Sequence, residues 1–393
     1  MTVRVLVVTN DFPPTVGGIQ TYVRDYLSAL NNQDAEIVVF ASTQDAQAAA
    51  EFDASVDYTV VRWPRSVMLP TPATAKRVQE LIRQHRIDTV WFAAAAPLAL
   101  MAKAAKRAGA TRVVASTHGH EVGWSMFPGS RQILGRIGHG VDCLTYVSHY
   151  ARGRMAGAFG PDVAWEPMPG GVNTELFQPD PQMRERLRAR YGVEDKKVIV
   201  AVSRIVPRKG QDVLVEAMPH IVEREPDAHL LLVGPGAMGD KLTRRADALG
   251  VADSVTVTGA VDFAELPGHY CAGDVFALPV RTQAGGLSVE GLGIVFLEAQ
   301  ACGVATIAGS GGGAPETVVD GQTGTVVNGS DARQVAASIV NLLSDANLRH
   351  NIATAGRHRV EAAWTWEQLA HQWMAVMEGH GGVPPRVAWN VPL

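Results

Sequence analysis

Two glutamates, Glu290 and Glu298, flank the predicted start of a helix in a glycine-rich part of the sequence. Glycines at positions 285, 286, 291 and 293 surround Glu290, and an apolar stretch begins at Ile294. Glycine lets a backbone N–H approach a ligand closely, and a helix N-terminus presents unpaired N–H groups to an anion. Carboxylates accept hydrogen bonds from sugar or ribose hydroxyls. The pattern favours a nucleotide-sugar site over the plainer alternative, a loop with two exposed glutamates.

A basic loop, Ser203–Gly210, follows a predicted strand and contains Arg204, Arg208 and Lys209. A diphosphate leaving group develops negative charge, which either a metal or basic side chains must neutralise. The sequence contains no Asp-x-Asp pair, which disfavours a metal-bound diphosphate. We expect Arg204 and Lys209 to hold the diphosphate and Arg208 to point elsewhere. A solvated basic turn is the alternative.

A glycine pair, Gly17 and Gly18, lies before a predicted helix near the start of the chain. It departs from the G-x-G-x-x-G fingerprint of dinucleotide-binding domains, which weakens an oxidoreductase interpretation. Glycines at a helix start still suit a phosphate or a sugar. Asn10, Asp11 and Gln20 border the same loop, and we assign them to the acceptor side.

His118 follows another predicted strand, within Ser116–Glu121. A side chain at the carboxyl end of a parallel strand faces the ligand side of the sheet, where a histidine can bond a sugar hydroxyl. His120 and Glu121 would complete a metal site, but this spacing on a loop is not specific for metal ligands. A structural histidine is the default alternative.

The motifs lie at the ends of apolar runs that alternate with helical patterns, as is typical of parallel sheets covered on both faces. Strands are predicted at 4–8, 36–40, 58–62, 88–92, 112–116 and 142–147, with helices near 73–86, 97–108 and 131–139. Prolines and glycines crowd residues 167–181 and predict a linker. After Tyr191, strands are predicted at 197–202, 230–233, 255–257 and 275–278, with helices at 210–224, 239–249, 292–302 and 331–360. The predicted fold is α/β, with two doubly wound Rossmann-like domains facing each other across a cleft.

Composition narrows the class of protein further. At 393 residues the chain exceeds the size at which one core usually divides into two domains. A net charge of −4 gives no support to a nucleic-acid partner. Three widely spaced cysteines suit a reducing compartment. No signal peptide is apparent, and the longest apolar stretch, 91–102, is shorter than the ~20 residues that span a bilayer. We expect a cytoplasmic protein, soluble or peripheral on a membrane.

These motifs, in this order, resemble the retaining glycosyltransferases of family 4, which have the GT-B architecture. Glu290 and Glu298 match the family's E-x7-E motif, and Arg204 and Lys209 match its diphosphate-binding R-x4-K. Gly17 and Gly18 match the glycine loop near the donor, and His118 matches the cleft histidine. The segment 171–177 is similar to the interdomain linker G-V-D-T-E-x-F, with Asn173 in place of Asp.

The resemblance implies a role for each matching residue. Glu290 would contact the transferred sugar, Glu298 would hold the ribose hydroxyls, and the base would lie near Gly259, Ala260 and Val261. Gly293, Ile294 and Val295 would contact the diphosphate and the sugar. The last helix, 364–378, would cross back to the first domain, so that the domains comprise 1–170 with 364–378, and 171–363.

The first residues and the 118–121 and 309–316 loops resemble one group within this family, the mannosyltransferases that act on phosphatidylinositol monomannoside. This resemblance implies GDP-mannose as the donor, a glycolipid acceptor and an α-1,6 linkage. The missing Asp-x-Asp pair leads us to expect no metal cofactor. Because the sequence offers no clear carboxylate nucleophile, we expect a front-face mechanism, in which the departing diphosphate accepts the proton of the acceptor hydroxyl.

A glycolipid acceptor requires a surface that meets an anionic membrane. Residues 62–86 contain six arginines and lysines and one acid, Glu80, with Trp63, Met68 and Leu69 interleaved. Such a stretch suits an anionic bilayer, although a solvated helix face has the same composition. The sequence leaves the oligomeric state open.

Four other functions stay open at this stage. One is a UDP-sugar transferase with a soluble acceptor, and another is a nucleotide-sugar epimerase, which would turn over the donor alone. A dinucleotide-dependent oxidoreductase lacks its fingerprint. A non-catalytic sugar-binding module would not need Arg204, Lys209, Glu290 and Glu298 together.

Overall fold

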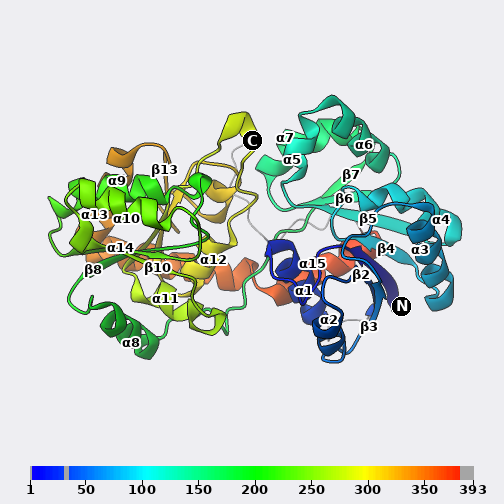
Figure 1. Cartoon of the computed structure of the whole chain (residues 1–393), viewed down its shortest axis with the longest axis horizontal. Helices are drawn as coiled ribbons and strands as arrows, with labels where there is room; N and C mark the ends of the chain where they lie inside the picture. Colours follow the sequence, from blue (N-terminus) through cyan, green and yellow to red (C-terminus); the bar gives the residue numbers. More distant parts are fainter. Residues whose placement is uncertain (1, 31–34, 381–393) are drawn as a thin grey trace. The chain divides into compact units, whose positions relative to one another are not determined.

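The computed structural model describes residues 2–30 and 35–380 of the chain. These residues form two compact units: one joins the chain up to Gly171 with the segment that begins at Trp366, and the other is Val172–Thr365. Each unit contains one parallel sheet flanked by helices (Figure 1). The predicted α/β fold with two Rossmann-like domains is confirmed, and their meeting across a cleft stays a prediction.

The first unit is built on seven parallel strands in the order β3-β2-β1-β4-β5-β6-β7. The interior strand β1 (Val3–Thr9) contains Val5–Val8, all of them fully buried, because helices cover both faces of the sheet. Neighbouring strands pair in register, with Val5 opposite both Ile37 and Thr89. The strands are β1 (Val3–Thr9), β2 (Ala35–Ser42), β3 (Thr59–Trp63), β4 (Thr89–Phe92), β5 (Arg112–Thr117), β6 (Cys143–Tyr146) and β7 (Ala164–Pro167).

Helices connect these strands in turn. They are α1 (Gly18–Ala29), α2 (Ala46–Asp53), α3 (Pro72–His85), the 3-10 turn η1 (Leu98–Met101), α4 (Ala102–Ala108), α5 (Glu121–Ser125), α6 (Pro128–Gly138) and α7 (His149–Phe159). From β3 onward the chain crosses the sheet in one direction through α3, α4, α6 and α7. Right-handed crossovers therefore place these four helices on one face of the sheet.

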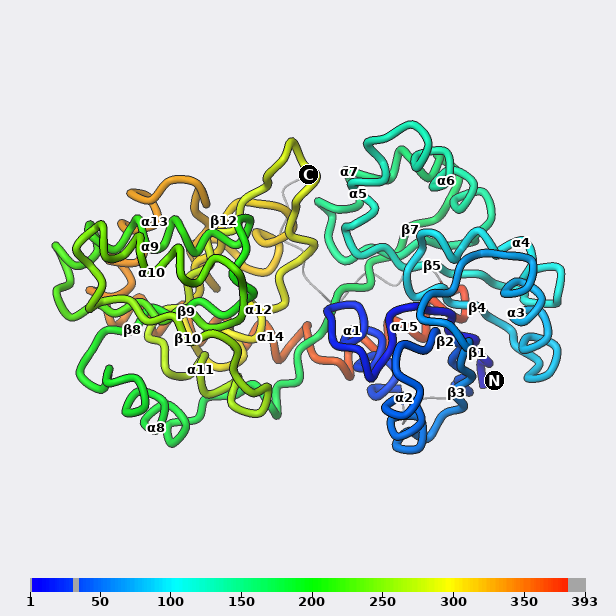
Figure 2. Tube along the Cα trace, in the orientation of Figure 1, coloured from blue at the N-terminus to red at the C-terminus, as the bar shows by residue number. Residues whose placement is uncertain are grey.

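The C-terminal helix α15 (Trp366–Glu378) belongs to the first unit, as predicted for the crossing helix. Its Trp373 ring lies 5.6 Å from that of Trp91, and Thr89 donates a hydrogen bond to the Met377 carbonyl at 3.0 Å. Figure 2 shows the red end of the described chain beside the blue helix α1, with which it is in contact. Buried aromatic surface thus fixes the helix to this sheet.

The second unit contains six parallel strands in the order β10-β9-β8-β11-β12-β13. They are β8 (Lys197–Val202), β9 (Ala228–Val233), β10 (Val255–Gly259), β11 (Val275–Leu278), β12 (Ala305–Gly309) and β13 (Thr325–Val327). The helices are α8 (Pro181–Tyr191), α9 (Gln211–Val222), α10 (Gly239–Ala248), α11 (Leu266–Ala272), α12 (Ile294–Ala301), α13 (Ala332–Ser344) and α14 (Ala346–Ala363). From β8 the chain adds β9 and β10 on one side of β8, and it then adds β11, β12 and β13 on the other side. The strand order therefore reverses between β8 and β11.

The structure corrects several predicted elements. The single helix predicted at 331–360 is two helices, because Asp345 has non-helical backbone angles and its side chain accepts a hydrogen bond from the Leu348 N–H. A helix, α8, precedes the point at which the second alternation was expected to begin. Three short strands escaped prediction, namely β7, β12 and β13.

Candidate active site

The reversal of strand order places two loops of the second unit next to each other. Ser203–Gly210 follows β8, and the segment from Pro279 to Gly293 follows β11, which pairs with β8 through Val275 and Ile199. In doubly wound sheets, ligands bind outside the carboxyl ends of the strands at such a reversal. The basic loop and the glycine-rich loop singled out in the sequence therefore share one location.

The basic loop is held against the end of β11 by its last glycine. Gly210 has a φ of +80°, and a Cβ there would lie 2.1 Å from the carbonyl oxygen of Pro279. Gln211, which is buried, donates from Nε2 to Ser203 Oγ at 2.7 Å and to the Arg204 carbonyl at 3.1 Å. These contacts fix the loop while the Arg204 side chain stays exposed.

Lys209 and Glu290 form a largely buried ion pair across the two loops. Lys209 Nζ lies 2.8 Å from Glu290 Oε2, with side-chain exposures of 9% and 12%. Arg208 Nε lies 3.7 Å from the same oxygen. The expectation that Arg208 points elsewhere is therefore wrong, because its guanidinium lies beside the Glu290 carboxylate and adds to the charge compensation of this largely buried group. Lys209 and Glu290, which the sequence assigns to the diphosphate and to the transferred sugar, thus lie side by side.

Helix α12 begins directly beside Glu290. Gly293 is its N-cap with a φ of +92°, and no side chain caps the helix. The backbone N–H groups of Ile294 and Val295, in the first turn, thus have no acceptor within the helix. Such unpaired N–H groups can bind an anion. The Gly313 N–H donates to the Glu290 carbonyl at 2.9 Å, so the loop after β12 supports the glutamate from its other side. The run Gly311-Gly312-Gly313 was the sequence signal for this support, and its role was missed.

Glu298 lies one turn further along α12 and is half-buried. Its Oε2 accepts a hydrogen bond of 2.5 Å from the hydroxyl of Tyr270 on α11. Burial raises the pKa of the tyrosine well above its ordinary value, so the phenol remains a donor at neutral pH. No pattern in the sequence indicated that Tyr270 is the partner of Glu298.

The residues assigned to the nucleotide base lie at the end of β10, which is two strands away from β8 in the sheet. Gly259 ends β10 with a φ of +72°, and its carbonyl accepts a hydrogen bond of 3.0 Å from the Gly234 N–H. Val261 is half-buried just beyond it. Both lie at the carboxyl ends of the strands, on the same edge of the sheet as Lys209 and Glu290.

A second group of predicted residues follows β1 in the first unit, where the strand order also reverses, between β1 and β4. Asn10 uses its side-chain amide to bind the backbone of Met68, donating at 2.9 Å and accepting at 2.7 Å. Gln20 donates to Asp11 Oδ1 at 3.0 Å. In this structure the amide of Asn10 therefore has a structural task.

The two glycines of this loop differ in their surroundings. A Cβ on Gly17 would lie 2.3 Å from the Gln20 side-chain oxygen, whereas a Cβ on Gly18 would meet nothing within 4 Å. A side chain at position 17 would require only that the end of the Gln20 side chain move, and Gly18 starts α1 beside open space. Space next to a helix start is what a ligand at this position requires.

His118 follows β5, and its ring is fixed by hydrogen bonding and stacking. Nε2 lies 2.6 Å from the Ala93 carbonyl, which can only accept, so Nε2 carries the proton. The ring lies edge-on to Tyr22 with centroids 4.8 Å apart. Burial lowers the pKa of the histidine, so the imidazole is neutral at pH 7.

The Glu121 carboxylate accepts hydrogen bonds from the backbone of the loop that contains His118. Its Oε2 accepts the N–H groups of His118 and Gly119 at 3.0 and 3.2 Å, and its other oxygen lies 3.2 Å from His120 Nε2. Across residues 2–30 and 35–380, no group of three or more His, Cys, Asp or Glu side chains is arranged to hold a metal ion.

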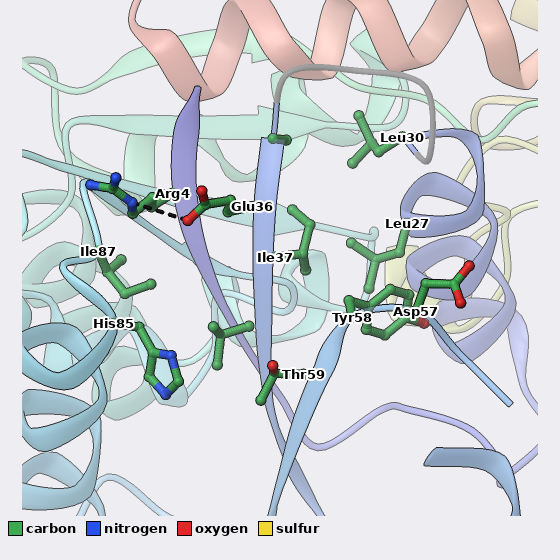
Figure 3. Close-up of a pocket in the computed structure, with 12 residues that line it drawn as sticks. Arg4, Leu27, Leu30, Glu36, Ile37, Asp57, Tyr58, Thr59, His85 and Ile87 are labelled. Atoms are coloured by element: carbon green, nitrogen blue, oxygen red, sulfur yellow. Dashed lines mark hydrogen bonds and ion pairs between the residues drawn. The ribbon is translucent and has the colours of Figure 1, made fainter. Parts of the chain in front are cut away.

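A pocket of about 410 Å³ lies at the opposite end of the first sheet from Asn10 and His118 (Figure 3). Arg4 on β1 and Glu36 on β2, which pair at 3.0 Å, line it together with Ile37 and Tyr58. Because it lies at the amino ends of the strands, it is separate from the candidate site.

Solved structures first identify the fold. HepE of Anabaena in complex with UDP superimposes with a TM-score of 0.78 at 20% identity, covering 96% of this chain and all of that one. Sucrose-phosphate synthase from Thermosynechococcus elongatus superimposes with a TM-score of 0.75 at 21% identity, covering 96% and 99% of the two chains. At these identities the likeness shows the fold alone, which is the two-domain GT-B architecture.

Sequence relatives narrow the class to one family. Residues 16–176 match the model "Glycosyltransferase Family 4", and residues 183–359 match "Glycosyl transferases group 1". The chain is 51% identical to the GDP-mannose-dependent monoacylated alpha-(1-6)-phosphatidylinositol monomannoside mannosyltransferase of Corynebacterium glutamicum, over 95% of this chain and 98% of that protein. It is 49% identical to the GDP-mannose-dependent alpha-(1-6)-phosphatidylinositol monomannoside mannosyltransferase of Mycolicibacterium smegmatis, with the same coverage. The chain belongs to the family of these mannosyltransferases, which confirms the resemblance noted in the sequence.

Proposed function

We propose that this protein is a retaining α-mannosyltransferase that moves mannose from GDP-mannose to phosphatidylinositol monomannoside in an α-1,6 linkage. The observation that carries the proposal is the near full-length similarity to enzymes named for this donor and acceptor. The ion pair of Lys209 and Glu290 beside an uncapped helix start supports a nucleotide-sugar donor site in the same chain.

The second unit supplies the chemistry for a leaving diphosphate. The Lys209 ammonium has three donors, so it can hold a phosphate oxygen while it keeps Glu290 in place. Arg204 adds a flexible cation from the same loop, and the first turn of α12 adds N–H groups. These positive groups stabilise the charge that develops as the bond from the anomeric carbon to the diphosphate breaks.

The acceptor hydroxyl attacks in a front-face mechanism. Its oxygen forms the new bond to the anomeric carbon on the side from which the diphosphate leaves, and its proton passes to the departing diphosphate. The Glu290 carboxylate accepts hydrogen bonds from the mannose hydroxyls and so orients the sugar. The Glu298 carboxylate accepts hydrogen bonds from the ribose hydroxyls. In the first unit, the neutral ring of His118 can offer a hydrogen bond without adding charge. No metal is required, because the basic groups already neutralise the diphosphate.

A glycolipid acceptor brings the enzyme to a membrane surface. Helices α3, α4, α6 and α7, which cover one face of the first sheet, contain ten arginines and lysines and one acid, Glu80. Val67 and Leu69, just before α3, are more than half exposed. No helix in the described part of the chain is long and apolar enough to cross a membrane. We propose that this basic face binds the inner surface of the cell membrane peripherally.

Thermal unfolding with GDP, UDP, ADP and NAD at equal concentration tests the donor first. Binding to the folded state raises stability by RT ln(1 + [L]/Kd), about 2.7 kcal/mol at 100 times Kd. We expect a shift with GDP, and then transfer of mannose from GDP-mannose to a phosphatidylinositol monomannoside acceptor. A shift with UDP alone would remove the GDP-mannose assignment, and turnover of the donor without acceptor would indicate an epimerase.

A further inference from the structure

A hydrogen bond connects the core of the second unit to a carboxylate of the proposed donor site. The Tyr270 hydroxyl donates to Glu298 Oε2 at 2.5 Å. Tyr270 is completely buried on α11, whereas Glu298 on α12 is half-buried and retains access to solvent. The bond therefore runs from a rigid interior group to a side chain that a ligand can reach.

Packing fixes the tyrosine ring independently of its hydroxyl. The rings of Phe177 and Phe276 lie 5.9 and 5.6 Å from it, and Phe276 in turn contacts Phe296 of α12 at 5.7 Å. Because these contacts involve only the ring, the hydroxyl can be removed without disturbing them. The position of the hydroxyl is thus set before any ligand binds.

We infer that Tyr270 is a positioning residue for the nucleotide, which holds the Glu298 carboxylate in the orientation that accepts the ribose hydroxyls. This inference rests on the proposed function, since it requires a nucleotide in the second unit. A glutamate side chain on a helix surface loses rotamer freedom when it binds a ligand. A charge-assisted hydrogen bond from a fixed phenol restricts that freedom in advance, so the ribose binds to a preorganised acceptor.

Substitution Tyr270→Phe removes the hydroxyl and keeps the ring. We would measure by calorimetry the affinity of the wild type and the variant for GDP and for its dideoxy analogue, which lacks both ribose hydroxyls. In the wild type, GDP should bind at least ~10-fold more tightly than the analogue, as expected for hydrogen bonds to a charged group. In Tyr270→Phe this ratio should fall to about 3 or less, through weaker GDP binding alone.

Tyr191→Phe is the matched control. The Tyr191 hydroxyl also hydrogen-bonds a side chain of α11, His269 Nε2 at 2.9 Å, but it does not contact Glu298. This variant should keep the wild-type ratio. If Tyr270→Phe weakens GDP and the analogue equally, or weakens neither, Tyr270 does not position Glu298 and the inference is overturned.

A double-mutant cycle with Glu298→Gln provides a second test. Glu298→Gln should itself reduce the ratio, and Tyr270→Phe should then have no further effect, because the two residues act through one hydrogen bond. Independent, additive losses would contradict the inference. If the wild type binds UDP and not GDP, the same measurements are made with UDP and its dideoxy analogue. Binding of UDP alone would exclude GDP-mannose as the donor. The role of Tyr270 would then be decided by the ratio of the affinities for UDP and for its dideoxy analogue. Binding of no nucleotide would overturn both.

Discussion

Lys209 Nζ lies 2.8 Å from Glu290 Oε2, with both side chains largely removed from solvent at the point where the strand order of the second sheet reverses. Arg208 approaches the same oxygen at 3.7 Å. Two cations around one carboxylate leave positive charge in excess, and a diphosphate can use that excess.

Lys209→Ala should lower kcat/KM at least ~100-fold, because it removes a cation from the leaving group. Steady-state kinetics with GDP-mannose would measure the loss. Lys197→Ala is the control, since Lys197 also pairs with a glutamate, Glu225 at 2.6 Å, but lies at the start of β8. The control should retain nearly wild-type kinetics. A loss of less than tenfold for Lys209→Ala, about 1.4 kcal/mol, would mean that the lysine does not stabilise the leaving group.

Gly293→Ala should destabilise the protein and weaken donor binding. Its φ of +92° disfavours a side chain, and a Cβ would lie 2.7 Å from the ring of Phe296. Gly250→Ala is the control, because Gly250 has a similar φ of +70° with nothing within 4 Å of its Cβ position. Backbone strain should cost each variant about 1 kcal/mol in the free energy of unfolding. Gly293→Ala should lose at least ~1 kcal/mol more from the clash, and it alone should bind GDP less tightly. Equal unfolding midpoints in urea would contradict the clash.

His118→Gln should flatten the dependence of stability on pH. Burial lowers the pKa of His118 below 6.5, so the unfolded chain binds a proton at a higher pH than the folded protein does. The stabilisation is therefore complete above pH 6.5 and is lost as the pH falls below that value toward the folded pKa. Glutamine removes this titration and can still donate to the Ala93 carbonyl. Urea unfolding at intervals between pH 7.5 and pH 5 should show a smaller loss for the variant. Parallel curves would mean that His118 titrates alike in both states.

Lys76→Glu combined with Arg83→Glu should reduce binding to anionic liposomes at least ~10-fold at low salt, because each basic residue near such a surface contributes about 1 kcal/mol. Both side chains are exposed on α3. Lys241→Glu with Arg244→Glu makes the same change of charge on α10 of the second unit and should bind as the wild type does. Co-sedimentation measures both variants. If the wild-type protein does not bind anionic liposomes at low salt, the membrane proposal is excluded.

Dialysis against EDTA should leave the rate of mannose transfer unchanged. Arg204, Lys209 and the start of α12 are expected to neutralise the diphosphate without a metal. Added Mg²⁺ or Mn²⁺ should change the rate less than twofold. A rate that disappears with EDTA and returns with a divalent cation would assign the leaving-group charge to a metal.

Most of the fold could be predicted from patterns within short stretches of the sequence. Val5–Val8 predicts a strand buried on both faces because four consecutive apolar residues cannot alternate toward water. The glycines before Ile294 predict a helix start that can receive an anion, because glycine conformation and unpaired N–H groups are properties of a short segment. The break at Asp345 was also local, and the N-capping tendency of aspartate was the signal that the prediction overlooked.

The two parallel sheets, the segments that contain the site and the family of the chain could all be inferred from the sequence alone. The folded structure was needed to show which side chains meet: Arg208 near Glu290, Tyr270 on Glu298, and the amide of Asn10 on the backbone of Met68. It likewise established that Trp373 of the last helix packs on Trp91 of the first unit. These pairs are distant along the chain, and their meeting depends on strand order and core packing, which no short stretch of sequence encodes.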